Sequence, residues 1–322
     1  MANPNVGQRV AANWEAVVKT KPEDQIHDDY WLFNQMSAGE GFKGLGGGDF
    51  IVGPIEYALN TTVASYSDTD TFSTTRIDVF DRYEYQWKEY VGTVVLSYLE
   101  ADRNSGEGQV FPLLQGKLEN LRMSLRGTLN ADAFGAGTAN GGKVLNGLQL
   151  IVPNDPTTGT RGAINAATFS FWRSQQDLGT QTASAFDNLR AVMRSNYNKC
   201  SNGVGDQHPT FGVTTRTVFE GFEGLLVANE RFTDKGSADG GFKNEVVKFK
   251  GMKLSYDNDC GSGLMYLLNP KFYKWIYKTG AWMKGRPSIE PANQTVEIFT
   301  VRCMLNTIAV QPRRLGVITV IT

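Results

Sequence analysis

The sequence of 322 residues predicts a mixed α+β fold. Two segments between residues 51 and 87 place apolar side chains at every second position, which indicates paired strands with one covered face. A third segment, over residues 109–132, spaces its apolar residues by three and four, which indicates one long helix. Short helical and strand-like stretches follow, and the last of them are rich in β-branched residues.

The composition is that of an ordinary globular protein. Apolar residues make up 41% of the chain and charged residues 20%, which excludes a disordered chain, and the length suits one elaborate domain or two. Lys and Arg total 32 against 33 for Asp and Glu, so no global basic field supports sequence-specific DNA binding. The apolar runs are far shorter than the ~20 residues that cross a bilayer. Because the amino terminus also lacks a secretory pattern, we expect no membrane span and synthesis in the cytoplasm.

The residues that usually carry chemistry are few and scattered. Cys200, Cys260 and Cys303 have no C-x-x-C spacing, so we expect buried reduced thiols. His27 and His208 are the only histidines, which leaves no histidine-based metal motif and no Ser-His-Asp order. A G-x-G-x-x-G match at residues 39–44 lacks the preceding strand and following helix of a nucleotide site. The sequence therefore predicts a protein that is not an enzyme and holds no cofactor or metal.

Residues 1–49 are mixed in character and end in a glycine-rich stretch over residues 39–48. Glycine loses more backbone freedom on ordering than other residues, so we expect no regular structure in this stretch. The pattern predicts an arm followed by a hinge. The hinge candidates are Gly44, Gly46, Gly47 and Gly48.

The two alternating segments predict a long hairpin. The first runs from Ile51 to Val63 and the second from Ile77 to Trp87, and the polar stretch over residues 64–75 carries two isolated aromatic residues at its tip. A lone hairpin is at best marginally stable in water, so its apolar face needs another surface, such as a second subunit. The candidate contact residues at the tip are Tyr66, Asp68, Asp70, Phe72 and Arg76.

Two functional alternatives for the hairpin are weaker. Asp68 and Asp70 might suggest calcium, but the stretch lacks the glycine and distal glutamate of a loop site, so a solvated or arginine-paired tip is favoured. The aromatic residues at 83, 85 and 87 resemble a stacking platform for single-stranded nucleic acid. Because Asp78, Asp81 and Glu84 lie among them, a packed strand face is the better interpretation.

The predicted long helix over residues 109–132 would extend ~36 Å at 1.5 Å per residue, despite Gly116 and Gly127. Two further helices are predicted over residues 186–197 and 218–226, and strands over 210–214, 246–256 and 264–268. Asn269-Pro270 is placed to begin a short helix through Ile276. The last two segments, residues 295–310 and 315–321, predict a terminal antiparallel pair.

One stretch carries a family resemblance. Residues 146–175, NGLQLIVPNDPTTGTRGAINAATFSFWRSQ, resemble the "G-L-x-x-L-V … G-G-I-x-x-x-x-x-x-x-W-R" signature of tailed-bacteriophage major capsid proteins with the Hong Kong 97-like fold. Gly162-Ala-Ile164 stands where that family has a glycine pair. Ile55-Glu-Tyr57, Tyr85-Gln-Trp-Lys88 and Pro312-Arg-Arg-Leu-Gly316 follow in the family's order, so the resemblance spans nearly the whole chain.

The resemblance implies a division of the chain into four parts. Residues 1–49 would form an amino-terminal arm and glycine hinge, and residues 50–98 an extended hairpin loop. Residues 99–176 and 288–322 would form a peripheral domain with the long helix as its spine. Residues 177–287 would form an axial domain.

The resemblance also implies a function in interfaces rather than in chemistry. The chain would assemble with itself, as hexamers and pentamers, into the icosahedral head of a virion around double-stranded DNA held without sequence specificity. The implied partners are a portal, a separate scaffolding protein and, in some members, a decoration protein. Because the tip over residues 64–75 has no lysine, we expect no isopeptide cross-linking of the kind found in some members. An encapsulin-like nanocompartment, and more remotely a β-rich tail or receptor-binding module, are the alternatives.

Overall fold

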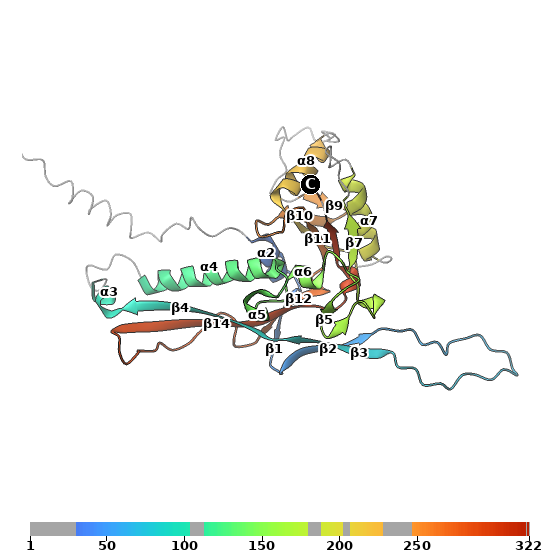
Figure 1. Cartoon of the computed structure of the whole chain (residues 1–322), viewed down its shortest axis with the longest axis horizontal. Coiled ribbons are helices and arrows are strands. Elements are labelled where there is room, and N and C mark those ends of the chain that lie inside the picture. The colour runs from blue at the N-terminus through green and yellow to red at the C-terminus, as the bar shows by residue number, and fades with distance from the viewer. Residues whose placement is uncertain are drawn as a thin grey trace, which may run out of the picture.

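The computed structural model describes residues 30–103, 113–179, 188–201, 207–227, 247–319 and 321. Figure 1 shows an elongated layer of long strands beneath one long helix, a lobe that rises from one end of this layer, and a hairpin that extends beyond it. The structure is therefore the mixed α+β fold that the sequence predicts.

Residues 30–45 belong to the folded body. α2 (Trp31–Ala38) buries Leu32, Phe33 and Met36 in the main core, and β1 (Phe42–Leu45) pairs in parallel with β12 (Tyr273–Lys278). The expectation that residues 39–48 hold no regular structure is therefore wrong for β1. The backbone of β12 supplies the missing hydrogen-bond partners, which offsets the entropy lost at glycine.

The predicted hairpin is confirmed. β2 (Phe50–Glu56) pairs antiparallel with β3 (Phe80–Gln86). Both strands are shorter than the sequence pattern indicates, because the first ends at Glu56 rather than Val63 and the second begins at Phe80 rather than Ile77. β4 (Lys88–Ser97) then continues into a long antiparallel pairing with β14 (Val296–Ala309). A short helix, α3 (Tyr98–Arg103), ends this run.

The predicted long helix is α4 (Leu113–Phe134), and its expected first residues, 109–112, lie outside the described residues. At 1.5 Å per residue it extends about 33 Å. It lies along β4 and β14 (Figure 1), where Gly92 leaves room for the side chain of Leu121. Tyr90 fixes the far end of the helix by donating its hydroxyl proton to Asp132 Oδ2 at 2.6 Å.

The loop region after α4 contains only short elements. In chain order they are α5 (Ala139–Gly142), α6 (Leu148–Ile151), β5 (Thr160–Arg161), β6 (Ile164–Asn165), η2 (Ser170–Trp172) and β7 (Gln175–Leu178). β5 and β6 form a two-residue hairpin. This region connects the elongated layer to the lobe.

A five-stranded sheet forms the elongated layer, with the order β1-β12-β14-β13 and with β4 also paired to β14. β13 spans Lys284–Gly285. The prediction of a helix from Asn269 through Ile276 is wrong, because Asn269 and Pro270 begin a turn in which Phe272 N donates to Asn269 O at 3.0 Å. The following residues form β12, a central strand bonded on both edges, and this pairing overrides the local signal.

A six-stranded sheet forms the lobe, in the order β7-β15-β11-β8-β10-β9. Its remaining strands are β8 (Phe211–Thr214), β9 (Val247–Phe249), β10 (Met252–Tyr256), β11 (Met265–Leu268) and β15 (Gly316–Thr319). The two predicted helices are α7 (Leu189–Ser201) and α8 (Arg216–Val227), which are confirmed, and the predicted strand over 246–256 is instead a hairpin of two strands.

The prediction that the last two segments pair with each other is wrong. β14 lies in the five-stranded sheet, whereas β15 lies between β7 and β11 in the six-stranded sheet. The turn η3 (Pro312–Arg314) carries the chain from one sheet to the other. The two strands pair with neighbours in different sheets, and local β propensity does not specify which sheet a strand joins. β12 thus lies in the sheet of the elongated layer, although its residues fall in the range expected for the axial domain. β15 lies in the lobe sheet, although its residues fall in the range expected for the peripheral domain.

Three clusters of buried side chains lie between the layer and the lobe, within the lobe and at the base of the hairpin. Cys200, Cys260 and Cys303 are free and buried, as the sequence predicts, and burial raises the pKa of the Cys303 thiol to about 12. Over the described ranges, none of the helices combines the length and the apolar character that a membrane crossing needs.

Candidate intersubunit surface

The base of the hairpin is anchored in its own subunit. Ile51, Tyr83 and Tyr85 point to the same face, and they pack with Ile164 and Trp172. The rings of Tyr83 and Trp172 stack with centroids 6.3 Å apart, and Tyr85 donates its hydroxyl proton to Ala309 O at 3.4 Å. The packed strand face that the sequence favours over a nucleic-acid platform is confirmed at Tyr83 and Tyr85.

A tight turn between β5 and β6 completes this anchor. Gly162 and Ala163 both have positive φ, 55° and 66°, as a two-residue hairpin of this length requires. Glu84 N donates to Gly162 O at 3.0 Å, so the turn is tied to β3. The glycine pair of the signature thus corresponds to a turn in which both residues adopt left-handed backbone conformations, and Ala163 occupies one of them.

The expectation that the apolar face of the whole hairpin lies on another subunit is therefore wrong for its base. One face of residues 50–56 and 80–86 is covered by the same chain, because side chains of β6, η2, β12 and β14 pack against it. The part left without cover is the loop over residues 57–79, which projects away from the body in Figure 1.

This loop exposes large apolar side chains. Leu59 is 87% exposed, Val63 82% and Phe72 71%, and Phe80 at the edge of the loop is 66% exposed. Single exposed apolar residues are normal on a soluble protein, but several on one projecting segment mark an interaction surface.

The tip of the loop has a defined local structure. Ser67 N donates to Asp70 Oδ2 at 2.9 Å, and Asp70 N donates to Ser67 O at 3.0 Å, which closes a small turn. The rings of Tyr66 and Phe72 meet edge to face across this turn, with centroids 6.5 Å apart. The structure thus brings three of the predicted tip residues together: Tyr66, Asp70 and Phe72.

The other two tip candidates stand apart. Asp68 and Arg76 are exposed, and neither forms an ion pair with any residue of the described chain. The tip is therefore solvated rather than arginine-paired. Its chemistry is that of an aromatic pair beside a free carboxylate.

The predicted hinge glycines divide into two groups. Gly44 lies within β1, where a Cβ atom would come within 3.1 Å of the ring of Tyr277. Gly46 and Gly47 have open space around them, and Gly47 and Gly48 have φ values of 156° and 114°. Only the connection over residues 46–48 has the freedom expected of a hinge, although Gly48 O accepts a hydrogen bond from Trp87 Nε1 at 2.8 Å.

A second apolar surface was not identified from the sequence. The odd-numbered residues of β4 face away from α4, and Val91 is 55% and Val95 50% exposed. Val95 pairs with Ile298, which in turn bridges to Ile289, itself 58% exposed. Glu89 and Arg302 form an ion pair at one end of this face. The sequence of β4 shows alternating residues, but it does not show which of the two faces is exposed. The structure shows this, because α4 covers the even-numbered residues.

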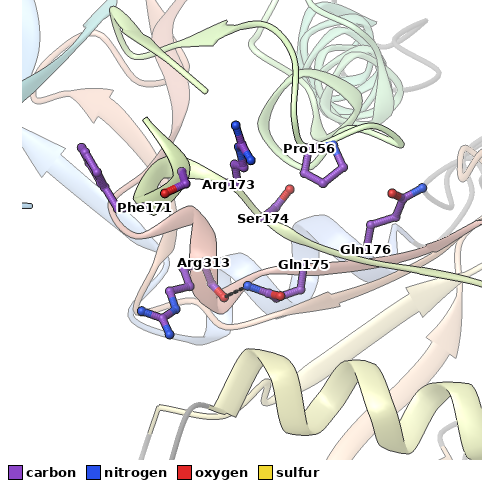
Figure 2. A pocket seen from close by; sticks show the side chains of 8 residues that line it. Pro156, Phe171, Arg173, Ser174, Gln175, Gln176 and Arg313 are labelled. Carbon is purple, nitrogen blue, oxygen red and sulfur yellow. Dashed lines mark hydrogen bonds between the residues drawn. The ribbon is translucent and has the colours of Figure 1, made fainter. Parts of the chain in front are cut away.

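A hollow of about 500 Å³ separates the segment before β7 from η3. Figure 2 shows Arg173 and Ser174 on one side and Arg313 on the other, with Gln175 Nε2 donating to Arg313 O at 3.4 Å. The guanidinium of Arg173 donates to Ala166 O at 2.7 Å and to Ala167 O at 2.9 Å, so it holds the loop together. Among the side chains that line it, none pairs a nucleophile with a general base.

The titratable groups of the described chain also form structural contacts. In the described ranges, no three His, Cys, Asp or Glu residues lie close enough to hold a metal ion. Buried Asp257 accepts hydrogen bonds from Leu32 N at 3.1 Å and from Asn130 Nδ2 at 3.0 Å, so it joins α2 and α4 to the lobe. Burial raises the pKa of its carboxyl group.

Comparisons with known proteins bear on the fold. No family model matches the sequence, and no curated protein sequence matches it. Solved structures do match over almost the whole chain. The cyanophage A-1(L) capsid protein is 14% identical, with 93% of this chain and 96% of that chain covered and a TM-score of 0.66.

Two further structures give the same result. A chain of the holo-SrpI encapsulin complex from Synechococcus elongatus PCC 7942 is 13% identical over 99% of this chain and 96% of its own, with a TM-score of 0.62. The capsid protein of Myoviridae phage XM1 is 12% identical over 99% of both chains, with a TM-score of 0.60. The chain therefore has the fold of these shell proteins, the Hong Kong 97-like fold that the resemblance implied.

Proposed function

We propose that this chain is the major capsid protein of a tailed bacteriophage, a structural subunit that assembles with copies of itself into the icosahedral head. One observation carries the proposal: the loop over residues 57–79 projects from a body that covers one face of the hairpin base, and it exposes Leu59, Val63 and Phe72. Exposed apolar surface on an ordered projection is costly in water unless a partner covers it.

The positions of the two apolar surfaces support a closed shell rather than a simple dimer. The loop and the outer face of β4 are different patches of the molecule. If the loop of one copy packs on the β4 face of the next, the contact is heterologous. Heterologous contacts produce rings when the rotation closes, and rings are the hexamers and pentamers of a shell. Such obligate interfaces usually bury more than ~2,000 Å² with an apolar centre.

Double-stranded DNA is the proposed content of the shell. The near balance of 32 basic and 33 acidic residues gives the chain no overall basic field that would resist the entry and release of DNA. The similarity to an encapsulin complex supports one alternative function, a nanocompartment around a protein cargo. A phage head and a nanocompartment of this kind would differ in what they contain, not in the fold of the subunit.

Negative-stain microscopy of the expressed protein tests the shell, and the content of purified particles tests the alternative. Closed particles that hold nuclease-protected DNA after phage infection support a phage head. Particles that hold a defined enzyme instead would show that the protein forms a nanocompartment and not a phage head. A monodisperse monomer at high concentration would contradict both.

The further partners are also part of the proposal: a separate scaffolding protein, a portal and, in some shells, a decoration protein, with assembly in the host cytoplasm. Uniform shells from this gene alone would remove the need for a scaffolding protein. We propose no catalytic activity and no covalent cross-linking. Denaturing electrophoresis of assembled particles should therefore give one band, and a ladder of covalent oligomers would contradict this.

A further inference from the structure

A second hollow, of about 560 Å³, lies on the lobe between α7 and β9. Arg190 and Arg194 line one wall and Lys248 and Lys250 the other, and all four side chains are exposed. The buried rings of Phe222 and Phe249 form the floor. Its lining residues are separate from those of the loop over residues 57–79 and of the outer face of β4.

The four positive charges lack acidic partners. Elsewhere in the lobe, Lys199 pairs with Asp177 and Arg216 pairs with Glu220. In the part of the chain that the structure describes, no such carboxylate meets the cations of this hollow. Within the described residues, a chain with a formal net charge of −1 thus gathers four unpaired cations at one place.

Lys250 is held in position at a conformational cost. Its φ is 47° at the turn between β9 and β10, a left-handed conformation that costs a lysine about 1 kcal/mol. Its ammonium group donates to Asn198 Oδ1 at 2.9 Å and lies 5.2 Å from the centre of the Tyr197 ring. Both partners are neutral, so the charge of the ammonium group remains available. The positive φ values of Lys250 and of Gly251, 47° and 85°, are those of a two-residue hairpin turn, because Phe249 pairs with Met252, and this turn fixes where Lys250 projects.

We propose that this hollow binds the phosphate backbone of double-stranded DNA without reading its sequence. The inference rests on the proposed function, which it deepens: the wall of α7 and β9 would face the packaged DNA. Each DNA strand carries one phosphate per ~3.4 Å of helix axis. Arg190 and Arg194 are one helical turn apart, ~6 Å along α7, so one strand can supply a phosphate to each.

An acidic segment of a second copy fits the hollow less well. The projecting tip is one acidic segment among the described residues, but it carries only two carboxylates, those of Asp68 and Asp70. Two negative charges would then face four cations. A phosphate backbone matches that charge, and the hollow is open enough for a continuous chain rather than a small enclosed anion.

The test compares two triple variants of the full-length protein with equal loss of charge. R190A/R194A/K248A removes three of the four cations that line the hollow, whereas K253A/K271A/K284A removes three exposed lysines outside it. Binding of a fluorescent 30-base-pair duplex is measured by anisotropy over a series of salt concentrations. Loss of three phosphate contacts should lower the slope of log K against log salt by about 2 to 3 units. We expect that change in the first variant and less than about one unit in the second.

Two additional measurements keep the outcome clear. Lys250→Gly removes both a cation and the left-handed strain, so it should lower the salt slope by about one without loss of stability in urea. Equal slopes for the two triple variants would overturn the proposal. So would binding of poly-glutamate that depends on the hollow while DNA binding does not, which would favour an acidic protein partner.

Failure of this inference is separable from failure of the proposed function. Both triple variants should give normal closed particles by negative-stain microscopy. If shells form but duplex binding ignores the hollow, only the DNA contact is wrong. If neither the parent protein nor any variant forms shells, the proposed function is wrong, and the result of the duplex-binding assay does not change this.

Discussion

The ring of Tyr85 lies directly against the backbone of Gly162, so that a Cβ atom at position 162 would come within 2.7 Å of ring atom Cε2. This contact fastens the hairpin to the turn between β5 and β6. It joins two segments that are far apart in the sequence, and it decides where the projecting loop leaves the body.

The substitution Gly162→Ala should therefore destabilise the protein by about 3 kcal/mol. The added methyl group meets the Tyr85 ring, and the φ of 55° disfavours any side chain. Urea unfolding followed by circular dichroism measures the change.

The neighbouring substitution Ala163→Gly is the matched control, because it is expected to act in the opposite direction. Ala163 has a φ of 66°, so glycine should stabilise the folded protein by about 1 kcal/mol. If both substitutions destabilise the protein equally, the left-handed turn is not what fixes this position.

Replacement of Tyr66 and Phe72 by serine should impair assembly more than folding. Both rings lie on the projecting loop and contribute nothing to the three buried clusters, so the subunit loses little when they are removed. Circular dichroism reports folding, and particle yield by light scattering reports assembly. Tyr66→Phe keeps the ring and should assemble normally. Equal loss of folding and assembly in the serine variant would contradict an intersubunit role.

Tyr90→Phe should cost about 1 to 3 kcal/mol of stability. The Tyr90 hydroxyl donates to Asp132 Oδ2 at 2.6 Å and accepts from Leu145 N at 2.9 Å, so its loss leaves two polar groups without a partner. The control is Tyr57→Phe, which removes an exposed hydrogen bond to Asp78 O and should change the free energy of unfolding little. Similar effects of the two substitutions would show that α4 is not locked through Tyr90.

Asp257 should make the stability depend on pH. Burial raises the pKa of its carboxyl group, so between the ordinary value of about 3.9 and the raised value the folded state binds more protons than the unfolded state. This contribution to stability is therefore present at low pH and is lost as pH rises through that window. Asn130, Asp259 and Leu32 N face the carboxylate from the packed elements.

The variant Asp257→Asn should remove this component of the pH dependence, measured by urea unfolding from pH 2 to 7, a range that includes the windows above and below the ordinary carboxyl pKa. Asp155→Asn is the contrasting control, since hydrogen bonds from Thr157 lower the pKa of the exposed Asp155 carboxyl group. It should flatten the opposite component, which is lost as pH falls. An unchanged profile for Asp257→Asn would show that this carboxyl does not titrate differently in the two states.

Periodicity identified the elements whose local pattern and tertiary environment agree. The hairpin strands, α4, α7 and α8 follow this rule, because one continuous face of each is buried. The same reasoning failed at β12, where a turn signal precedes a strand that is bonded on both edges. It also failed for β14 and β15, which have similar composition but lie in different sheets.

The candidate surface was predictable in part. The tip residues were visible as isolated aromatic and acidic residues in a polar stretch, and the structure brings Tyr66, Asp70 and Phe72 together. The outer face of β4 and the basic hollow between α7 and β9 were not visible. Both depend on which side of an element is covered, and the residues that line the hollow come from segments far apart in the chain.

The sequence by itself determined the α+β class, the long helix, the projecting hairpin and the absence of a recognisable catalytic motif, because these follow from spacing and residue type along the chain. Only the tertiary structure decided that the hairpin base is sheltered by its own subunit and that the loop over residues 57–79 is not. The physical reason is that burial is a property of partners in space, and hydrogen-bonded sheet edges select those partners without leaving a local trace in the sequence.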